Sequence, residues 1–158
     1  MTKDVLVSIS GLQMDVLEPE ESANEPIEVI TPAIYYFKNG KHFLFYDQME
    51  AGSASTTKNK IKITSEELME ISISGEASVN MSFEKGKKTI TYYYTPFGQL
   101  LLGIHTRDMK IDVDNDNINV KISYLLEVNH QPLADCEIKM NIKPKYAKDF
   151  DLNELMEF

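Results

Sequence analysis

The residues of this chain that could do chemistry gather in one short stretch, which contains Gly103, His105 and Arg107. Positions that differ by two lie on the same face of an extended strand, so these three would share one surface. A histidine exchanges protons near neutral pH, an arginine holds anions, and a glycine leaves a gap beside them. Pointing into a barrel, this face would suit a small acidic or polar ligand. Pointing outward, it would leave Arg107 solvated at the rim.

The opposite face of the same stretch favours the outward orientation. It carries the stronger apolar stripe, made of Leu100, Leu102 and Ile104 and followed by Thr106 and Asp108. In a half-buried strand the more apolar face packs on the core. Strict alternation through residues 100–109 therefore predicts that His105 and Arg107 lie on the outer side, beside Met109 and Ile111.

Three consecutive tyrosines provide a second set of candidate residues. An extended strand must divide Tyr92, Tyr93 and Tyr94 between its two faces, so Tyr92 and Tyr94 lie together. Exposed tyrosines are frequent anchors of interfaces, although strand propensity alone also explains tyrosine here. We take Tyr92 and Tyr94, with Gly103, His105 and Arg107, as the candidate ligand-binding residues.

Catalytic and metal-binding motifs are missing from the sequence. The three histidines, His42, His105 and His130, lie far apart, and the single cysteine, Cys136, reads as a buried apolar residue. No Gly-x-Ser-x-Gly motif or glycine-rich phosphate loop occurs. We expect no catalytic residues, no metal and no cofactor. An enzyme that uses His105, Arg107 and nearby tyrosines for proton transfer is the alternative.

Composition limits the partners and the location. The 158 residues carry a formal net charge of −9, which disfavours nucleic acid and anionic membrane as partners. Residues 15–28 hold six acidic residues and no basic one, which indicates either a solvated loop or a docking face for a basic partner. Neither a signal peptide nor a membrane-spanning segment is evident, so we expect a cytoplasmic protein.

The elements that must position these residues are short alternating strands, from about residue 3 to about residue 142. Asn39-Gly40 predicts a type I′ turn between two aromatic strands, and Glu84 to Lys87 predicts another hairpin turn. Lys58, Lys60 and Lys62 alternate along a later strand, which predicts that one of its faces is basic and exposed to solvent. Gly11 marks a bulge or kink, because the apolar parity changes there. Residues 51–57 read as a mobile loop.

This pattern predicts one all-β domain over residues 1–158, with its core in about residues 3–143. About eight to ten antiparallel strands joined as a meander would form a barrel or sandwich, since no room exists for crossover helices. The tail, residues 144–158, forms either a short helix capped by Asp151 or no regular structure.

Four segments carry a resemblance to a known family: residues 43–46, 57–62, 81–86 and 92–98. They resemble the YwiB-like family of small bacterial proteins of unknown function, found mainly in Firmicutes. The resemblance reaches to about residue 143 and implies a lipocalin-like (calycin-type) antiparallel barrel. It supplies no catalytic residues.

Two hypotheses about function follow. The first is a non-catalytic lipocalin-like barrel that binds a small, partly apolar ligand. The alternative is an interaction module with a filled barrel core, which binds a protein partner or a second copy of itself as a homodimer. An empty interior favours the first, and a packed interior favours the second.

Overall fold

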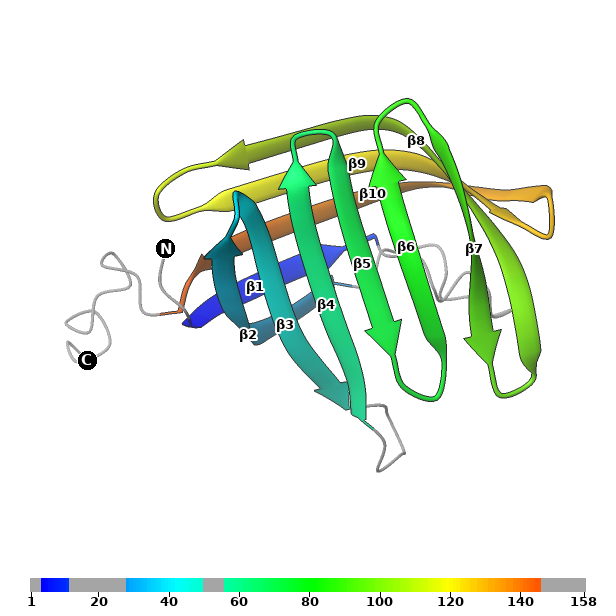
Figure 1. Cartoon of the computed structure of the whole chain (residues 1–158), viewed down its shortest axis with the longest axis horizontal. Coiled ribbons are helices and arrows are strands. Elements are labelled where there is room, and N and C mark those ends of the chain that lie inside the picture. Colours follow the sequence, from blue (N-terminus) through cyan, green and yellow to red (C-terminus); the bar gives the residue numbers. More distant parts are fainter. Residues whose placement is uncertain (1–3, 12–27, 50–55, 146–158) are drawn as a thin grey trace.

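The computed structural model describes residues 4–11, 28–49 and 56–145, and all regular structure in this part of the chain is β-strand (Figure 1). The ten strands are β1 (Asp4–Ser10), β2 (Glu28–Lys38), β3 (Lys41–Met49), β4 (Thr56–Ser65), β5 (Leu68–Ser74), β6 (Ser78–Glu84), β7 (Lys88–Thr95), β8 (Gly98–Val113), β9 (Ile118–Val128) and β10 (Gln131–Pro144). The described residues include no helix that is long and apolar enough to cross a membrane.

The strands form a closed antiparallel barrel with meander connections, as predicted. Each strand pairs with the next one along the chain, and β1 pairs with β10 to close the barrel. Closure removes the exposed sheet edges that would otherwise pair with other chains.

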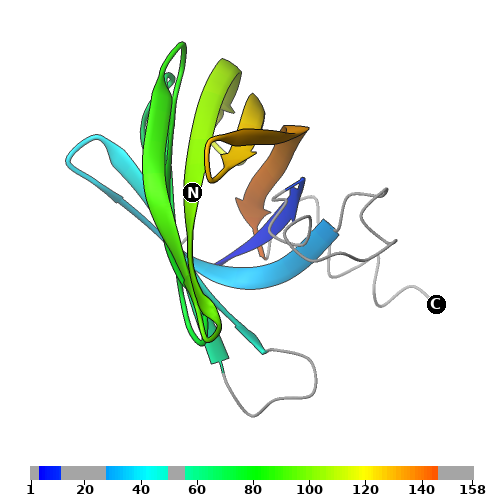
Figure 2. The same ribbon diagram turned by 90° about the vertical axis from the view of Figure 1, so that its right-hand side faces the viewer.

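The barrel is flattened into two layers. Strands β3 to β7 lie in front of β1 and β8 to β10, which run across them at a steep angle (Figure 1), and the side view separates the layers (Figure 2). Two long strands connect the layers by changing partners along their length. Residues 28–34 of β2 pair with β1 and residues 34–38 with β3. Residues 98–105 of β8 pair with β7, and residues 102–113 pair with β9.

The turns have the backbone that their residues predict. Asn39 and Gly40 both have positive φ, 54° and 74°, which a type I′ turn requires. The amide of Lys87 donates a hydrogen bond to the carbonyl of Glu84 at 3.0 Å, which closes the second predicted hairpin.

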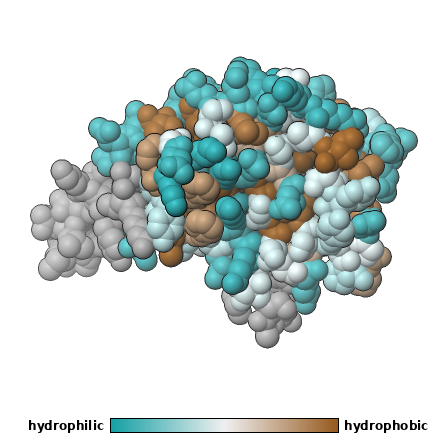
Figure 3. Space-filling model, in the orientation of Figure 1, coloured by the Kyte–Doolittle hydropathy of each residue, from teal (hydrophilic) through white to brown (hydrophobic). Residues whose placement is uncertain are grey.

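Inward-facing side chains from both layers fill the barrel. The buried apolar residues include Phe83, Leu102, Ile122, Leu126 and Ile138, each no more than 1% exposed. Cys136 is buried among them, as expected for an apolar cysteine. On the outer side, Figure 3 shows hydrophilic and hydrophobic side chains interspersed over β3 to β7. The core is therefore shared by the two layers and leaves selected apolar side chains on the outside.

Some boundaries differ from the prediction. Glu28 begins β2 rather than ending an acidic loop, and Thr56 and Thr57 belong to β4 rather than to a mobile loop. In each case the strand extends into polar residues because it pairs with a neighbouring strand. The rest of both predicted loops, and the predicted tail helix, lie outside the described residues.

Gly11 follows β1 and lies against the backbone of β10. Its φ is +82°, and a Cβ atom at this position would lie 1.7 Å from the carbonyl oxygen of Glu137. Only glycine fits both the backbone conformation and the space. The bulge or kink at Gly11 was predicted because the apolar residues after it have the opposite parity. Those residues, within 12–16, lie outside the described residues.

The Gly11→Ala variant is expected to lower the free energy of unfolding by at least about 3 kcal/mol, because left-handed strain and a backbone clash combine. Gly86→Ala is the matched control: its φ is +78° with no atom within 4 Å of the added Cβ. It should cost only about 1 kcal/mol. Urea unfolding of both variants measures the difference, and equal losses would contradict the proposed contact with β10.

Candidate functional site

The candidate tyrosines lie on the outer face of β7. Tyr92 and Tyr94 are 47% and 54% exposed, and their ring centroids are 6.1 Å apart. Ile90 shares this face and is 56% exposed, whereas Tyr93 packs against the core from the inner face. The tyrosines divide between the two faces as the sequence predicts.

Gly103 lies on the outer face of β8, next to Ile90 of β7 and Glu127 of β9. The gap that it leaves is occupied by an ion pair: Lys88 Nζ lies 2.7 Å from Glu127 Oε1. A Cβ at Gly103 would lie 3.1 Å from that carboxylate oxygen and 3.2 Å from Cε of Lys88. The glycine therefore lets a β7 side chain reach across β8 to β9, and the predicted gap is filled by the protein itself.

A β-bulge at Arg107 changes the parity of β8. The register with β9 shifts between Thr106 and Asp108, so Arg107 is an extra residue without a partner position. Thr106 is buried before the bulge, whereas Met109 and Ile111 are buried after it. The predicted strict alternation through residues 100–109 is therefore wrong, because one inserted residue moves every later side chain to the other face.

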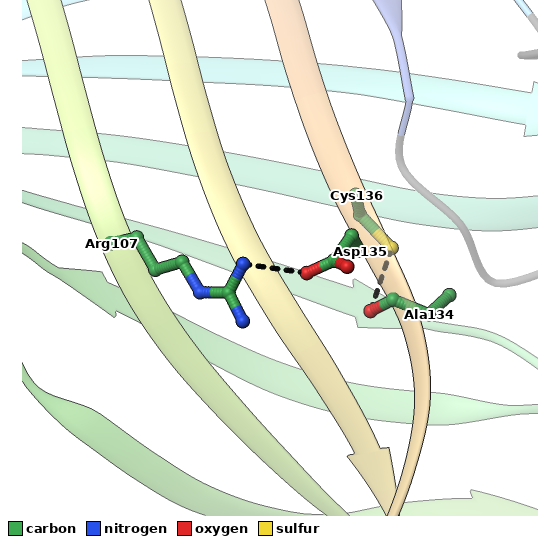
Figure 4. Close-up of polar contacts among 4 residues, drawn as sticks. All are labelled: Arg107, Ala134, Asp135 and Cys136. Atoms are coloured by element: carbon green, nitrogen blue, oxygen red, sulfur yellow. Dashed lines mark hydrogen bonds and ion pairs between the residues drawn. The ribbon is translucent and has the colours of Figure 1, made fainter.

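His105 and Arg107 are both exposed on the outer face, which is the orientation that the sequence favours. The guanidinium of Arg107 extends across β9 to Asp135 of β10, with Nη1 2.7 Å from Oδ1 (Figure 4). The two side chains are 53% and 72% exposed, so this ion pair contributes at most about 1 kcal/mol. In the same figure the Sγ of Cys136 lies 3.9 Å from the carbonyl oxygen of Ala134.

The structure thus gathers the candidate residues on one outer surface rather than in a cavity. We call this surface the β7–β8 face and define it by Ile90, Tyr92, Tyr94, Leu101 and Gly103. His105 lies beside it, and Arg107 lies beyond the bulge. Phe97, at the tip of the β7–β8 turn, is 99% exposed. The face is apolar and aromatic, with its charges confined to ion pairs at the border.

Three hollows of about 290, 390 and 580 Å³ occur elsewhere, and each is lined by exposed residues together with buried ones, such as Tyr46, Met140 and Met109 respectively. The 580 Å³ hollow follows the edge of β8 after the bulge, where the pairing with β7 has ended, and meets the turns at Glu67 and Lys85. The 390 Å³ hollow lies over β1, β8, β9 and β10, and its lining includes Ser8, Lys110 and Asn141. None of the five candidate residues lines these three hollows.

Sequence reasoning missed a second outer surface, on β2 to β4. Here Tyr36 pairs with Phe43, Phe43 with Lys62, and Phe45 with Lys60. The basic strand and the aromatic hairpin were each visible in the sequence. Extending the register of the Asn39-Gly40 turn to the next strand would have placed them side by side.

The pKa shifts occur under this second surface. The hydroxyl of Tyr35 lies 2.7 Å from Nδ1 of His42, and burial raises the pKa of Tyr35 and lowers that of His42. Burial also raises the pKa of Tyr46 to about 12. Within the described residues no group of three or more His, Cys, Asp or Glu side chains could hold a metal ion.

Comparison with known proteins agrees with this architecture. Residues 7–140 match the family described as "Domain of unknown function (DUF1934)". The chain is 28% identical over 113 residues to the uncharacterized β-barrel protein YwiB of Bacillus subtilis strain 168, a match that covers 71% of this chain and 77% of that protein. The crystal structure of YwiB from Bacillus subtilis superposes with a TM-score of 0.72 at 24% identity, covering 90% and 92% of the two chains.

The Thr106→Val variant is expected to raise the free energy of unfolding by about 1 kcal/mol. Thr106 is fully buried, and its hydroxyl has no hydrogen-bond partner among the described residues. Thr89→Val is the matched control, since the Thr89 hydroxyl donates to the carbonyl of Ser82 at 2.6 Å and its loss should destabilise the fold. Thermal unfolding measures both variants. A lower melting temperature for Thr106→Val would show that the hydroxyl has a partner.

Acid is expected to destabilise the protein partly through His42. Because the pKa of His42 is lower in the folded state, the unfolded state binds more protons below about pH 6.5, so stability falls as the pH decreases through that window. Denaturant unfolding at several pH values should show that acid lowers the free energy of unfolding less for His42→Gln than for the unmodified protein. The glutamine keeps an acceptor for Tyr35 but does not titrate. If the free energy of unfolding of both proteins depended on pH in the same way, this role of His42 would be contradicted.

Proposed function

Since the chain belongs to the DUF1934 family, whose function is unknown, we propose that it is a non-catalytic interaction module that self-associates through the β7–β8 face. The barrel supplies a rigid support, and the outer side chains of β7 and β8 make the contact. A cytoplasmic location is part of the proposal. So is the lack of a nucleic acid or anionic membrane partner, which rests on the acidic composition.

The observation that carries the proposal is the exposure of neighbouring large apolar side chains on one strand face. Ile90, Tyr92 and Tyr94 alternate with inward residues, so all three point to the same side of β7. Tyrosine and isoleucine side chains so placed can be buried by a partner with little loss of hydrogen bonding. Contiguous exposed apolar surface of this kind marks interaction sites more often than chance.

The charge distribution is compatible with a second copy as the partner. Two copies that each carry a net charge of −9 repel one another, and this repulsion is weakest when they meet through uncharged surfaces. The β7–β8 face holds no charged side chain among its five defining residues, and Lys88 and Glu127 at its border neutralise each other. A two-fold contact would place this face against itself, which is the commonest geometry of homodimers.

The packed interior makes the small-ligand alternative less well supported. The inward positions of the strands are occupied mostly by large apolar side chains with little or no exposed surface. His105 and Arg107 face solvent, and Arg107 is paired with Asp135. These features favour binding on the outer surface.

The double variant Ile90→Ser/Tyr92→Ser is expected to weaken self-association at least about tenfold, because it removes two central apolar contacts. Val113→Ser is the matched control, since Val113 is 51% exposed but ends β8 away from this face. Analytical ultracentrifugation over a range of concentrations measures the dissociation constants. A strict monomer for the unmodified protein, or equal effects of the two variants, would disprove the proposal.

A further inference from the structure

The outer surface of β2 to β4 combines lysines with aromatic rings in a regular grid. We call it the basic–aromatic face and define it by Tyr36, Phe43, Phe45, Lys58, Lys60 and Lys62. Cross-strand pairing sets its rows: Tyr36, Phe43 and Lys62 form one row, and Ile34, Phe45 and Lys60 form the next. Tyr36 and Phe45 contact each other edge to face, with ring centroids 6.1 Å apart.

The lysines of this face lack the ion pairs that several other lysines make with described residues. Within the described residues, Lys58, Lys60 and Lys62 make no ion pair within 4.0 Å, whereas Lys85, Lys87, Lys88, Lys121 and Lys139 do. Asp47 and Glu70 pair in register with Lys58 and Lys62 at opposite ends of the face, but Lys60 is flanked by Phe45 and Ser72. A local positive surface on a chain of net charge −9 therefore has room for added negative charge.

The lysines also lie over the aromatic rings. Lys60 Nζ is 5.8 Å from the ring centroid of Phe43 and 5.9 Å from that of Phe45, and Lys62 Nζ is 5.9 Å from that of Phe43. A base would need an open ring face on which to stack, but here ammonium groups lie over the two phenylalanines. Carboxylates need only the ammonium groups, which stay reachable because Lys60 is exposed. This arrangement favours an acidic protein segment over a nucleic acid.

A hollow adjoins the face where β2 and β3 separate. Its volume is about 290 Å³, and its walls include Ile34, Phe45 and Tyr46. The pairing of β2 with β3 begins at Ile34 and Phe45, so the two strands diverge there. Its lining also includes Asp4, Asp47 and Lys145. A hollow of this size accepts one large apolar side chain of a bound segment against Ile34 and Phe45, and Phe45 pairs with Lys60, which would hold a carboxylate of the same segment.

We propose that the basic–aromatic face binds a short acidic segment of a partner protein, with glutamate or aspartate side chains on Lys60 and Lys62 and one apolar side chain in the hollow beside Ile34 and Phe45. The segment is short because the rest of the surface is acidic and repels a long polyanion once it extends past the face. This is a second binding surface, separate from the β7–β8 face. Figure 3 shows that hydrophilic and hydrophobic side chains mix over the front layer, to which this surface belongs.

Fluorescence anisotropy with a labelled peptide in which glutamates flank one phenylalanine tests the proposal. The unmodified protein should bind this peptide and not a peptide with lysines in place of the glutamates. Lys60→Glu/Lys62→Glu should weaken binding at least about tenfold, because attraction becomes repulsion. Rising salt should weaken binding to the unmodified protein in parallel.

The double variant Lys110→Glu/Lys143→Glu is the matched control, since it makes the same change in net charge at two exposed positions of the other layer. It should keep at least half of the affinity. Equal weakening by both double variants, no binding of the peptide, or tighter binding of an oligothymidylate than of the peptide would overturn the proposal. If Lys60→Glu/Lys62→Glu unfolds, the salt dependence and the lysine-substituted peptide still decide between these outcomes.

Discussion

Close packing of the inward-facing side chains is the interaction on which the rest of this structure depends. Every second residue of each strand is available to the interior, and large apolar side chains such as Phe83, Leu44 and Ile71 are fully buried there. Packing of this kind supplies most of the stability of a small barrel. Because large side chains occupy the inside, the surfaces that we propose to bind other molecules are on the outer faces.

The two outer surfaces lie next to the positions at which the two long strands change partners. Ile34 and Phe45 mark the position at which β2 leaves β3, and the bulge at Arg107 follows the position at which β8 leaves β7. The β7–β8 face adjoins one such position and the basic–aromatic face adjoins the other. One surface is uncharged and the other is positive, so they would select different partners.

Much of the fold was predictable because alternation and turn residues are local signals. Asn39-Gly40 predicted a hairpin turn, and Cys136 was correctly predicted to be a buried apolar residue. The bulge at Arg107 was missed, although the apolar positions change parity between Ile104 and Met109, which is the same kind of signal that marked Gly11. The outward orientation of His105 was predicted from its apolar neighbours. The ion pair of Lys88 with Glu127 over Gly103 requires the pairing of three strands, which no single segment encodes.

We propose that the barrel interior is filled and that binding occurs on the outside. Xenon enters dry apolar cavities of sufficient size and is visible in diffraction, so a crystal of this protein under xenon pressure tests the claim directly. We predict no xenon site among the inward side chains of Phe83, Ile122 and Leu126. An occupied xenon site there would reveal an internal cavity, contradict the filled core and restore the small-ligand hypothesis.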